Sequence, residues 1–513
     1  DMDQFRSDIE SSLLLLSPAQ TIDNLADQYQ VTLSHILDGH APLVSIRVRQ
    51  RVLRPWFSSN IAKAKLDRRR LERRWRRSKL EIDRQLFVES RNNVSRLLLD
   101  AKTSFYSARI RELSGNQKAL FSEINHLLHN PTDTQLPPHD PAEVLANQFA
   151  EYFSEKIEKL RRELQCCIGH PPSTSSTQPC PVLIINELSS FDKVSIENVS
   201  ELIMSSPSKT CALDPIPTRL LKQFTDLLAP TITSMINLSL STGTVPNEWK
   251  DAIVLPTLKR KQDVLTKENY RPISNLPFVS KICEKTVAVQ FTNHLRENGL
   301  MEPFQSAYRA NHSTETALLR VFNDILRSMD QQKITILVLL DLSAAFDTVD
   351  HNILLHRLHT RFGISGTALD WFKDYLSNRR QRVSVNGSLS DPVQVKCGVP
   401  QGSVLGPLLF LAYISPLGDI IRRNGLDFHL YADDTQLYLA FDFVKSQIAL
   451  GTIQAAICNI KEWLLLNMLK FNASKTDLCV IGTHQQLSKL NLPLAMHIEQ
   501  CEIPTGEWIT NLG

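Results

Sequence analysis

The chain has 513 residues, of which 42% are hydrophobic and 22% are charged, and its formal net charge is only +3. This composition is ordinary for a globular protein, and the length allows two or more domains with a large core. The small net charge does not by itself support nucleic-acid binding, so any argument for such binding must depend on where the charges lie.

The nine cysteines are scattered, without the short paired spacing of zinc sites or the density of a disulfide scaffold. We expect reduced thiols in an intracellular protein. The longest apolar stretches, such as Val404 to Ile414, are shorter than the roughly 20 residues that a membrane-spanning helix needs. The apolar run from Leu13 to Leu16 is too short for a signal peptide and follows acidic residues. We therefore expect neither a membrane segment nor a signal sequence.

An arginine-dense segment follows a region of predicted short helices, which covers residues 1 to about 55 with a loop near Gly39. The dense run extends from Lys63 to Lys79, and helical spacing of apolar residues continues it to about Leu113. Guanidinium groups without matching acids repel one another unless phosphates neutralise them, so this run is predicted to bind RNA or DNA. The alternative is a solvated helix face. The arginines expected to make the contact are Arg68, Arg69, Arg70, Arg73, Arg74, Arg76 and Arg77.

Two breaks divide the chain. Residues 131–141 are rich in helix-breaking residues and precede an amphipathic helix, whose apolar stripe we attribute to packing. Gly169 to Pro181, rich in Pro, Ser and Thr, predicts a flexible linker. The predicted organisation is a helical basic connector over 1–130, a linker with one helix over 131–182, an extension over 183–236 and a main domain over 237–513.

Cations gather near the start of the main domain. Asp251 to Leu258 predicts a strand, which Lys259 and Arg260 follow directly, and Arg271 stands a few residues further on. Surface solubility and ligand binding are equally open interpretations of these side chains.

Acidic residues follow two predicted strands. Lys333 to Asp341 is a continuous apolar run that predicts a strand buried on both faces and ending on an acid. Asp433 and Asp434 interrupt two β-rich runs within residues 429–439, which predicts a hairpin with the acidic pair at its tip. The alternative for the pair is an ordinary turn, where Asp is common. Strands that bring carboxylates together predict a Mg²⁺ site, and a pair of such ions roughly 3.5–4 Å apart suits phosphoryl transfer.

A glycine-rich loop, Cys397 to Phe410, lies between the two acidic sites in the chain. Gly398, Gly402 and Gly406 allow the backbone to approach a flat ligand closely before a helix begins, and Gln401 adds a polar tip. We interpret the loop as a floor under a base pair. The alternative is a strand-to-helix connection with suitable turn chemistry.

Three of these segments together resemble motifs A, B and C of reverse transcriptases. They are Asp341 to Asp347 (Asp-Leu-Ser-Ala-Ala-Phe-Asp), Val399 to Gly402 (Val-Pro-Gln-Gly) and Tyr431 to Asp434 (Tyr-Ala-Asp-Asp). The flanking sequence is most similar to polymerases of non-LTR, LINE-type retrotransposons of the jockey and CR1 kind, from about Thr210 to Gly513. The resemblance implies an α+β fold, with the fingers and palm of a right-hand polymerase around a small antiparallel sheet. Residues 183–236 would extend the fingers, and the thumb and an upstream endonuclease are expected to be missing.

The resemblance also implies an activity, RNA-directed DNA polymerisation, with two Mg²⁺ ions, or Mn²⁺, at Asp341, Asp433 and Asp434. Lys475 would protonate or neutralise the leaving pyrophosphate. Phe346 would exclude a 2′-hydroxyl, and the alternative for it is an aromatic side chain of the core. Asp347 and Asp350 are expected to be structural. The implied nucleotide contacts are Lys259, Arg260, Arg271, Phe346, Gln401 and Gly402.

The implied partners are an element RNA template, a DNA primer or nicked target DNA, and dNTP. The implied location is the cytoplasm, as a ribonucleoprotein, and the nucleus at the target site. Two alternatives stay open. One is a decayed remnant that retains only RNA binding, and the other is a related polymerase such as a group II intron maturase or an RNA-templated RNA polymerase.

Overall fold

A computed structural model describes residues 1–42, 55–127, 136–139, 141–168, 186–260, 263–490, 495–498, 501–506, 509 and 511–512. It divides into two compact units, one made of Asp1–Pro42 with Pro137–Gly513 and the other of Leu43–Leu136. This division differs from the predicted connector over residues 1–130, because the first 42 residues belong to the larger unit. The predicted linker from Gly169 to Pro181 lies outside the described residues, as do residues 131–135 and 140 of the predicted break.

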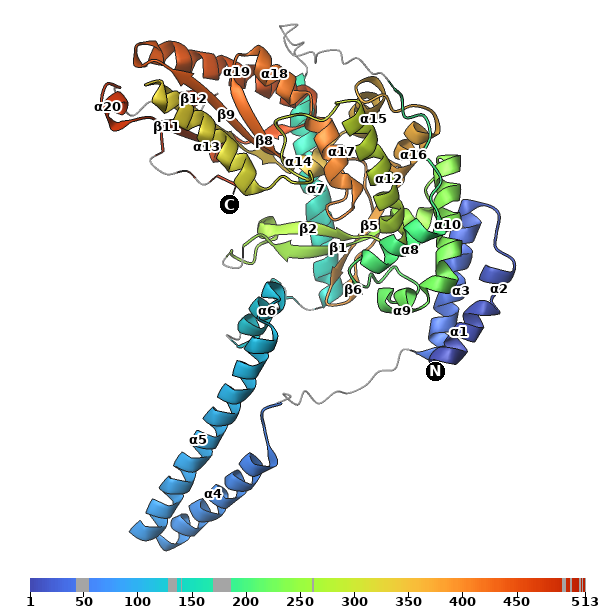
Figure 1. Ribbon diagram of the computed structural model, residues 1–513, viewed down its shortest axis with the longest axis vertical. Helices are drawn as coiled ribbons and strands as arrows, with labels where there is room; N and C mark the ends of the chain where they lie inside the picture. The colour runs from blue at the N-terminus through green and yellow to red at the C-terminus, as the bar shows by residue number, and fades with distance from the viewer. Residues whose placement is uncertain are drawn as a thin grey trace. The chain divides into compact units, whose positions relative to one another are not determined.

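The smaller unit is a helical hairpin (Figure 1). Its helices are α4 (Ser59–Ser78), α5 (Glu81–Glu112) and α6 (Gln117–Leu127). The arginine-dense run is helical as predicted, but the expectation of one continuous run to Leu113 is wrong. Lys79 adopts a left-handed conformation with φ 54° and ends α4, and the chain then reverses. Trp75 stacks on Phe87 across the hairpin with ring centroids 5.5 Å apart, so apolar packing between the two helices favours the reversal over a single exposed rod.

Three helices at the start of the chain pack on the larger unit. They are α1 (Met2–Glu10), α2 (Leu13–Leu16) and α3 (Ile22–His40). Phe5 lies with its ring centroid 5.3 Å from that of Phe224, and Arg6 Nη1 forms an ion pair with Asp226 Oδ2 at 2.7 Å. The predicted short helices are confirmed, and burial of their apolar stripes explains why they fold with the larger unit.

The central sheet of the larger unit has four strands in the order β11-β3-β9-β8, and all neighbours are antiparallel. Its strands are β3 (Ile334–Leu340), β8 (Asp427–Tyr431), β9 (Asp434–Phe441) and β11 (Asp477–Ile481). Alternate side chains of β3 face opposite layers: Leu337 packs with α13 (Thr314–Asp330), whereas Ile336 and Val338 join the main core. This confirms the predicted strand buried on both faces and the predicted acidic hairpin.

A second sheet has the order β2-β1-β5-β6, with β7 paired to β5. Its strands are β1 (Asp251–Leu258), β2 (Tyr270–Asn275), β5 (Arg380–Val385), β6 (Ser388–Leu389) and β7 (Val393–Gln394). Helix α7 (Ala142–Ile168) contacts β5 and β6, and Figure 1 shows it in cyan through the middle of the larger unit. Its predicted stripe is confirmed as packing, since Leu145, Phe149 and Phe153 are buried. Two smaller pairs are β4 (Leu342–Ser343) with β10 (Lys470–Phe471), and β12 (Ala495–Ile498) with β13 (Cys501–Pro504).

The remaining helices complete the core around these sheets, and the α+β class is confirmed. They are α8 (Ile196–Ser205), α9 (Thr218–Gln223), α10 (Thr225–Thr242), α11 (Asn247–Lys250), α12 (Phe278–Glu297), α14 (Ala345–Thr348), α15 (His351–Thr360), α16 (Gly366–Leu376), α17 (Leu405–Ile414), α18 (Leu417–Arg423), α19 (Ser446–Leu466) and α20 (His484–Leu487).

One helical stretch in the described part of the chain, Leu405–Arg423, is long and apolar enough to cross a membrane. The sequence predicted no such stretch because the apolar run was taken to end at Ile414, whereas the helix continues through α18. Within the structure 72% of its apolar window is buried, which is the environment of a core helix.

Candidate active site

The predicted acidic residues meet at one edge of the central sheet. Leu340 of β3 lies opposite Thr435 of β9, so Asp341, the next residue, is level with Asp434. Tyr431 pairs with Asp434 and leaves Ala432 and Asp433 as the turn of the hairpin. Since neighbouring strands lie about 4.8 Å apart, this register brings the three carboxylates together.

The charges of this cluster disfavour the ionisation of Asp433 and Asp434. Burial raises the pKa of Asp433, and the charge of Asp341 raises it further, while Arg271 lowers it. Burial, followed by the charges of Asp433 and Asp341, raises the pKa of Asp434 to about 6. An acidic cluster of this kind gains stability from a bound cation.

Among the described residues, no group of three or more His, Cys, Asp or Glu side chains is arranged to hold a metal ion. The aspartates therefore form no preassembled cage of the kind that suits Zn²⁺ or Ca²⁺. Mg²⁺ usually keeps several waters and binds one or two carboxylates together with substrate phosphates. Asp341 and Asp433 fit that requirement, because they share one sheet edge and their charges interact.

The segment after α19 holds Asp341 in place. Strand β10 pairs with β4, next to Asp341 in the chain. Asn472 Nδ2 donates a hydrogen bond to Asp341 Oδ2 at 3.0 Å, and its backbone N–H donates to the Asp341 carbonyl at 3.0 Å. Lys475 Nζ lies 3.7 Å from Asp341 Oδ2. The structure thus brings the predicted Lys475 to the acidic edge, together with Asn472, which sequence reasoning missed because a single amide carries no motif.

The glycine-rich loop docks against the protein's own backbone. The Gln401 carbonyl accepts a hydrogen bond from Ser274 N at 2.7 Å. Gly402 has a φ of +121°, and a Cβ there would collide with the Ser274 carbonyl oxygen. A Cβ at Gly398 would lie 2.7 Å from the Asp347 carbonyl oxygen. The close approach predicted for a ligand is therefore made to β2 and α14, and the floor under a base pair stays a prediction.

Asp347, which was expected to be structural, contacts the glycine-rich loop. Gln401 Nε2 donates a hydrogen bond to Asp347 Oδ1 at 3.0 Å. Burial raises the Asp347 pKa to about 6, against the opposing influence of Lys156 and Gln401. Beside it, the ring of Phe346 stacks on Phe410 with centroids 4.2 Å apart, which fixes the ring without testing its predicted role.

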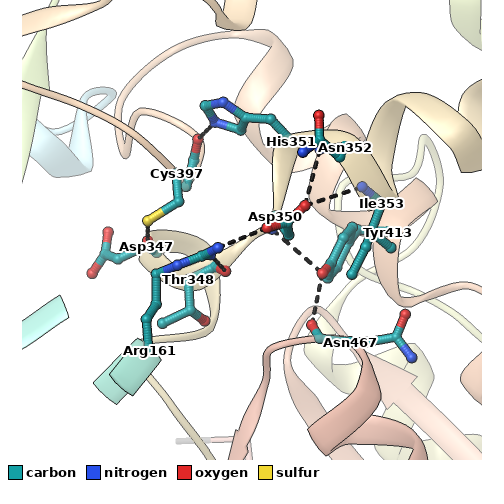
Figure 2. Close-up of polar contacts among 11 residues, drawn as sticks. Arg161, Asp347, Thr348, Asp350, His351, Asn352, Ile353, Cys397, Tyr413 and Asn467 are labelled. Carbon is teal, nitrogen blue, oxygen red and sulfur yellow. Dashed lines mark hydrogen bonds and ion pairs between the residues drawn. The ribbon is translucent and has the colours of Figure 1, made fainter. Parts of the chain in front are cut away.

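Asp350 has the structural role expected for it. Its Oδ1 accepts hydrogen bonds from the backbone N–H groups of Asn352 and Ile353 at the start of α15. Its Oδ2 forms an ion pair with Arg161 Nη2 of α7 at 2.7 Å (Figure 2). The helix α7 is thereby fastened to the loop that follows β4.

The predicted cations near the start of the main domain have different partners. Burial lowers the pKa of Lys259, and the charges of Lys156, Lys475 and Arg271 lower it further, so these four groups are neighbours. By contrast, the Arg260 backbone N–H binds Asp263 Oδ2 in the loop beyond β1. The Lys259 ammonium donates a hydrogen bond to the Glu268 carbonyl, and Arg271 is the predicted cation whose charge lowers the pKa of Asp433 at the acidic edge.

The arginine-rich hairpin is partly neutralised by its own acids. Arg74 Nε lies 2.9 Å from Asp83 Oδ1, and Arg76 Nη2 lies 2.7 Å from Glu72 Oε1. The premise that these guanidinium groups lack matching acids is wrong for those two, because the acids come from the next turn of α4 and from α5. Of the seven arginines predicted to bind nucleic acid, Arg69, Arg70, Arg73 and Arg77 are exposed and form no ion pair among the residues that the structure describes, and Arg68 is half-buried.

Comparison with known proteins identifies relatives. Residues 259–500 match the family described as reverse transcriptase (RNA-dependent DNA polymerase). The chain is 26% identical over 439 residues to the probable RNA-directed DNA polymerase from transposon BS of Drosophila melanogaster, covering 80% of this chain and 46% of that protein. It is 24% identical over 536 positions to the probable RNA-directed DNA polymerase from transposon X-element of the same species. This match covers 100% of this chain and 56% of that protein. It is 30% identical over 278 residues to the RNA-directed DNA polymerase from mobile element jockey of D. melanogaster. This match covers 53% of this chain and 29% of that protein. The chain thus spans about half the length of the first two relatives or less.

Proposed function

We propose that this chain, whose residues 259–500 match the reverse-transcriptase family and whose relatives include polymerases of the X-element and jockey transposons, is the part of an RNA-directed DNA polymerase that extends a DNA primer on an RNA template. The observation that carries the proposal is the meeting of Asp341, Asp433 and Asp434 at one sheet edge. In this proposal the central sheet is the palm, and the β1–β2 hairpin belongs to the fingers.

The reaction joins the primer 3′-oxygen to the α-phosphorus of a bound dNTP and breaks the bond to pyrophosphate. Asp341 and Asp433 would hold two Mg²⁺ ions, with Mn²⁺ as a substitute, and Asp434 would assist. When bound, the ions neutralise charge on the attacking and leaving oxygens. The protein's own contribution is to position the reactants, which supplies much of the catalysis in phosphoryl transfer.

Cations of the β1–β2 hairpin would bind the triphosphate. Arg271 lies on β2 opposite Thr257, and its planar guanidinium group suits bidentate contact with phosphate oxygens. Lys259, at the end of β1, would add a point charge. Lys475 would act on the leaving pyrophosphate as a general acid or by its charge. The Phe346 ring, supported by Phe410, would exclude a ribose 2′-hydroxyl and so select dNTP over NTP.

The exposed arginines of α4 would bind the element RNA or the target DNA through phosphates. Such contacts do not select a sequence, so they fit a role in holding the template near the polymerase. By family resemblance, the protein would act in a cytoplasmic ribonucleoprotein and at nuclear target DNA.

Primer extension tests the proposal. The purified chain is incubated with poly(rA) annealed to oligo(dT) and Mg²⁺, with dTTP in one reaction and UTP in another. We expect the primer to be extended in the reaction with dTTP and not in the reaction with UTP. Extension only with UTP would favour an RNA-templated RNA polymerase. If the chain binds the template in a salt-dependent way but extends no primer, the decayed remnant is favoured. The intact acidic edge argues against that alternative.

A further inference from the structure

Helix α7 lies outside residues 259–500, yet it runs along the candidate active site. In its first half the Phe149 ring packs edge-on against Tyr270 of β2, with centroids 5.1 Å apart. In its second half Arg161 pairs with Asp350 at 2.7 Å, as Figure 2 shows. The helix therefore touches the β1–β2 hairpin at one place and the start of α15 at another.

Lys156 lies between the two contacts, about two helical turns after Phe149. It lines a cavity of about 340 Å³ whose other walls include Pro272 of β2, Asp347 and Gln401. The cavity thus joins α7 to the same elements that form the candidate site. A lysine ammonium on a flexible four-carbon stem can reach a ligand bound in such a cavity.

Lys156 lowers the pKa of Asp347, so one acid lies near it, and several cations lie near it as well. Neither Lys156 nor Arg271 forms an ion pair among the residues that the structure describes. Lys156, Lys475 and Arg271 each lower the pKa of Lys259, so cations from four separate segments are held near one another. Repulsion among them is relieved by a ligand with several negative charges. A triphosphate carries that charge, and the neighbouring acidic edge is where its metal ions would bind.

We propose that Lys156 of α7 binds the triphosphate of the incoming nucleotide together with Lys259 and Arg271, so that a helix upstream of the reverse-transcriptase domain completes the nucleotide site. This inference rests on the proposed polymerase function and deepens it. A primer or template phosphate is a second source of the same chemistry, and the experiment separates the two.

The experiment compares Lys156→Gln with Lys159→Gln, a matched control on the same helix whose side chain is exposed and does not line the cavity. In primer extension, Lys156→Gln is expected to raise the KM for dTTP roughly tenfold, the effect of one charge-assisted hydrogen bond, with kcat little changed. Isothermal titration with inorganic tripolyphosphate, without metal, is expected to show a similar loss of affinity. Lys156→Arg should restore both, and Lys159→Gln should change neither.

The outcomes separate this inference from the proposed function. If the unaltered chain extends primers but Lys156→Gln keeps its KM for dTTP and its affinity for tripolyphosphate, the inference is overturned and the polymerase function stands. A raised Kd for primer–template with an unchanged KM for dTTP would assign Lys156 to nucleic acid and also overturn it. If the unaltered chain extends no primer, the proposed function fails, while the tripolyphosphate titration still tests Lys156. Should Lys156→Gln lower the Tm, Lys156→Met provides a second uncharged variant for the same titration.

Discussion

The acidic edge of the central sheet and the arginine-rich hairpin of the smaller unit are both concentrations of charge, but they differ in what surrounds them. At the acidic edge, strand register brings Asp341, Asp433 and Asp434 together, and burial with mutual repulsion raises the pKa of the last two. In the hairpin, most arginines lie on exposed helix faces, and acids of the hairpin pair with four of them, Arg74, Arg76, Arg84 and Arg109.

The difference teaches that charge density along the sequence is a poor guide to the strength of a site. Exposed charges are screened by salt within about 8–10 Å, whereas partly buried charges interact more strongly and depend on exact position. The acidic edge should therefore depend on individual residues. The hairpin should depend on the sum of its charges.

The largest expected effect is the loss of polymerase activity in Asp433→Asn. Removing one carboxylate charge where metal ions bind should slow primer extension by about 10³-fold or more. Because asparagine keeps the size of the side chain, the Tm should not fall. The control is Asp442→Asn, an exposed residue beyond the other end of β9. Near-normal extension by Asp433→Asn would contradict the assignment of the site.

The docking of the glycine-rich loop gives the next effect. In Gly402→Ala, the new Cβ collides with the Ser274 carbonyl in a backbone conformation that alanine disfavours. The loop should shift, and extension should slow by about 10²-fold, the cost of misplacing a catalytic element by roughly 1 Å. The control is Gly451→Ala, where a Cβ meets nothing within 4 Å and the helix should gain about 0.5–1 kcal/mol. Equal activity and stability in both variants would refute the docking argument.

The hairpin is tested by salt dependence. Replacing Arg69, Arg70, Arg73 and Arg77 with alanine should lower the slope of log affinity for RNA against log salt by up to about 3, at 0.7–0.9 per lost phosphate contact. The kcat of primer extension at saturating template should stay unchanged. Arg76→Ala, which removes an arginine already paired with Glu72, should alter the slope little. An unchanged slope in the fourfold variant would leave these arginines as a solvated helix face.

The smallest effect concerns stability and pH. Because the pKa of Asp434 is raised from 3.8 to about 6, the folded protein binds this proton more tightly than the unfolded chain. The resulting stability is present below about pH 4 and is lost as the pH rises through 6. The measured quantity is the free energy of unfolding of Asp434→Asn minus that of the unaltered chain, without metal. This difference should rise by on the order of 1 kcal/mol between about pH 4 and pH 6, a value reduced to allow for the exposure of Asp434. Chemical denaturation at several pH values measures it, and a constant difference would contradict the repulsion.

The local elements could be predicted from the sequence because their signals lie within a few residues. The apolar run ending at Asp341 forms β3, and the interrupted β-rich runs form the β8–β9 hairpin. Ser313 caps α13 with a reciprocal bond to Thr316, three residues further along the chain. Each case depends on side-chain alternation or capping chemistry that the neighbouring residues supply.

The sequence by itself thus determined the α+β class, the strands that carry the acids and the acidic turn. Only the tertiary structure decided which residues surround those acids. Gln401 reaches Asp347, Gly402 packs on Ser274, and α7 is fastened through Arg161 to a residue far along the chain. The physical reason is that such contacts join segments of distant sequence through packing and charge, and no local periodicity records which distant segments will meet.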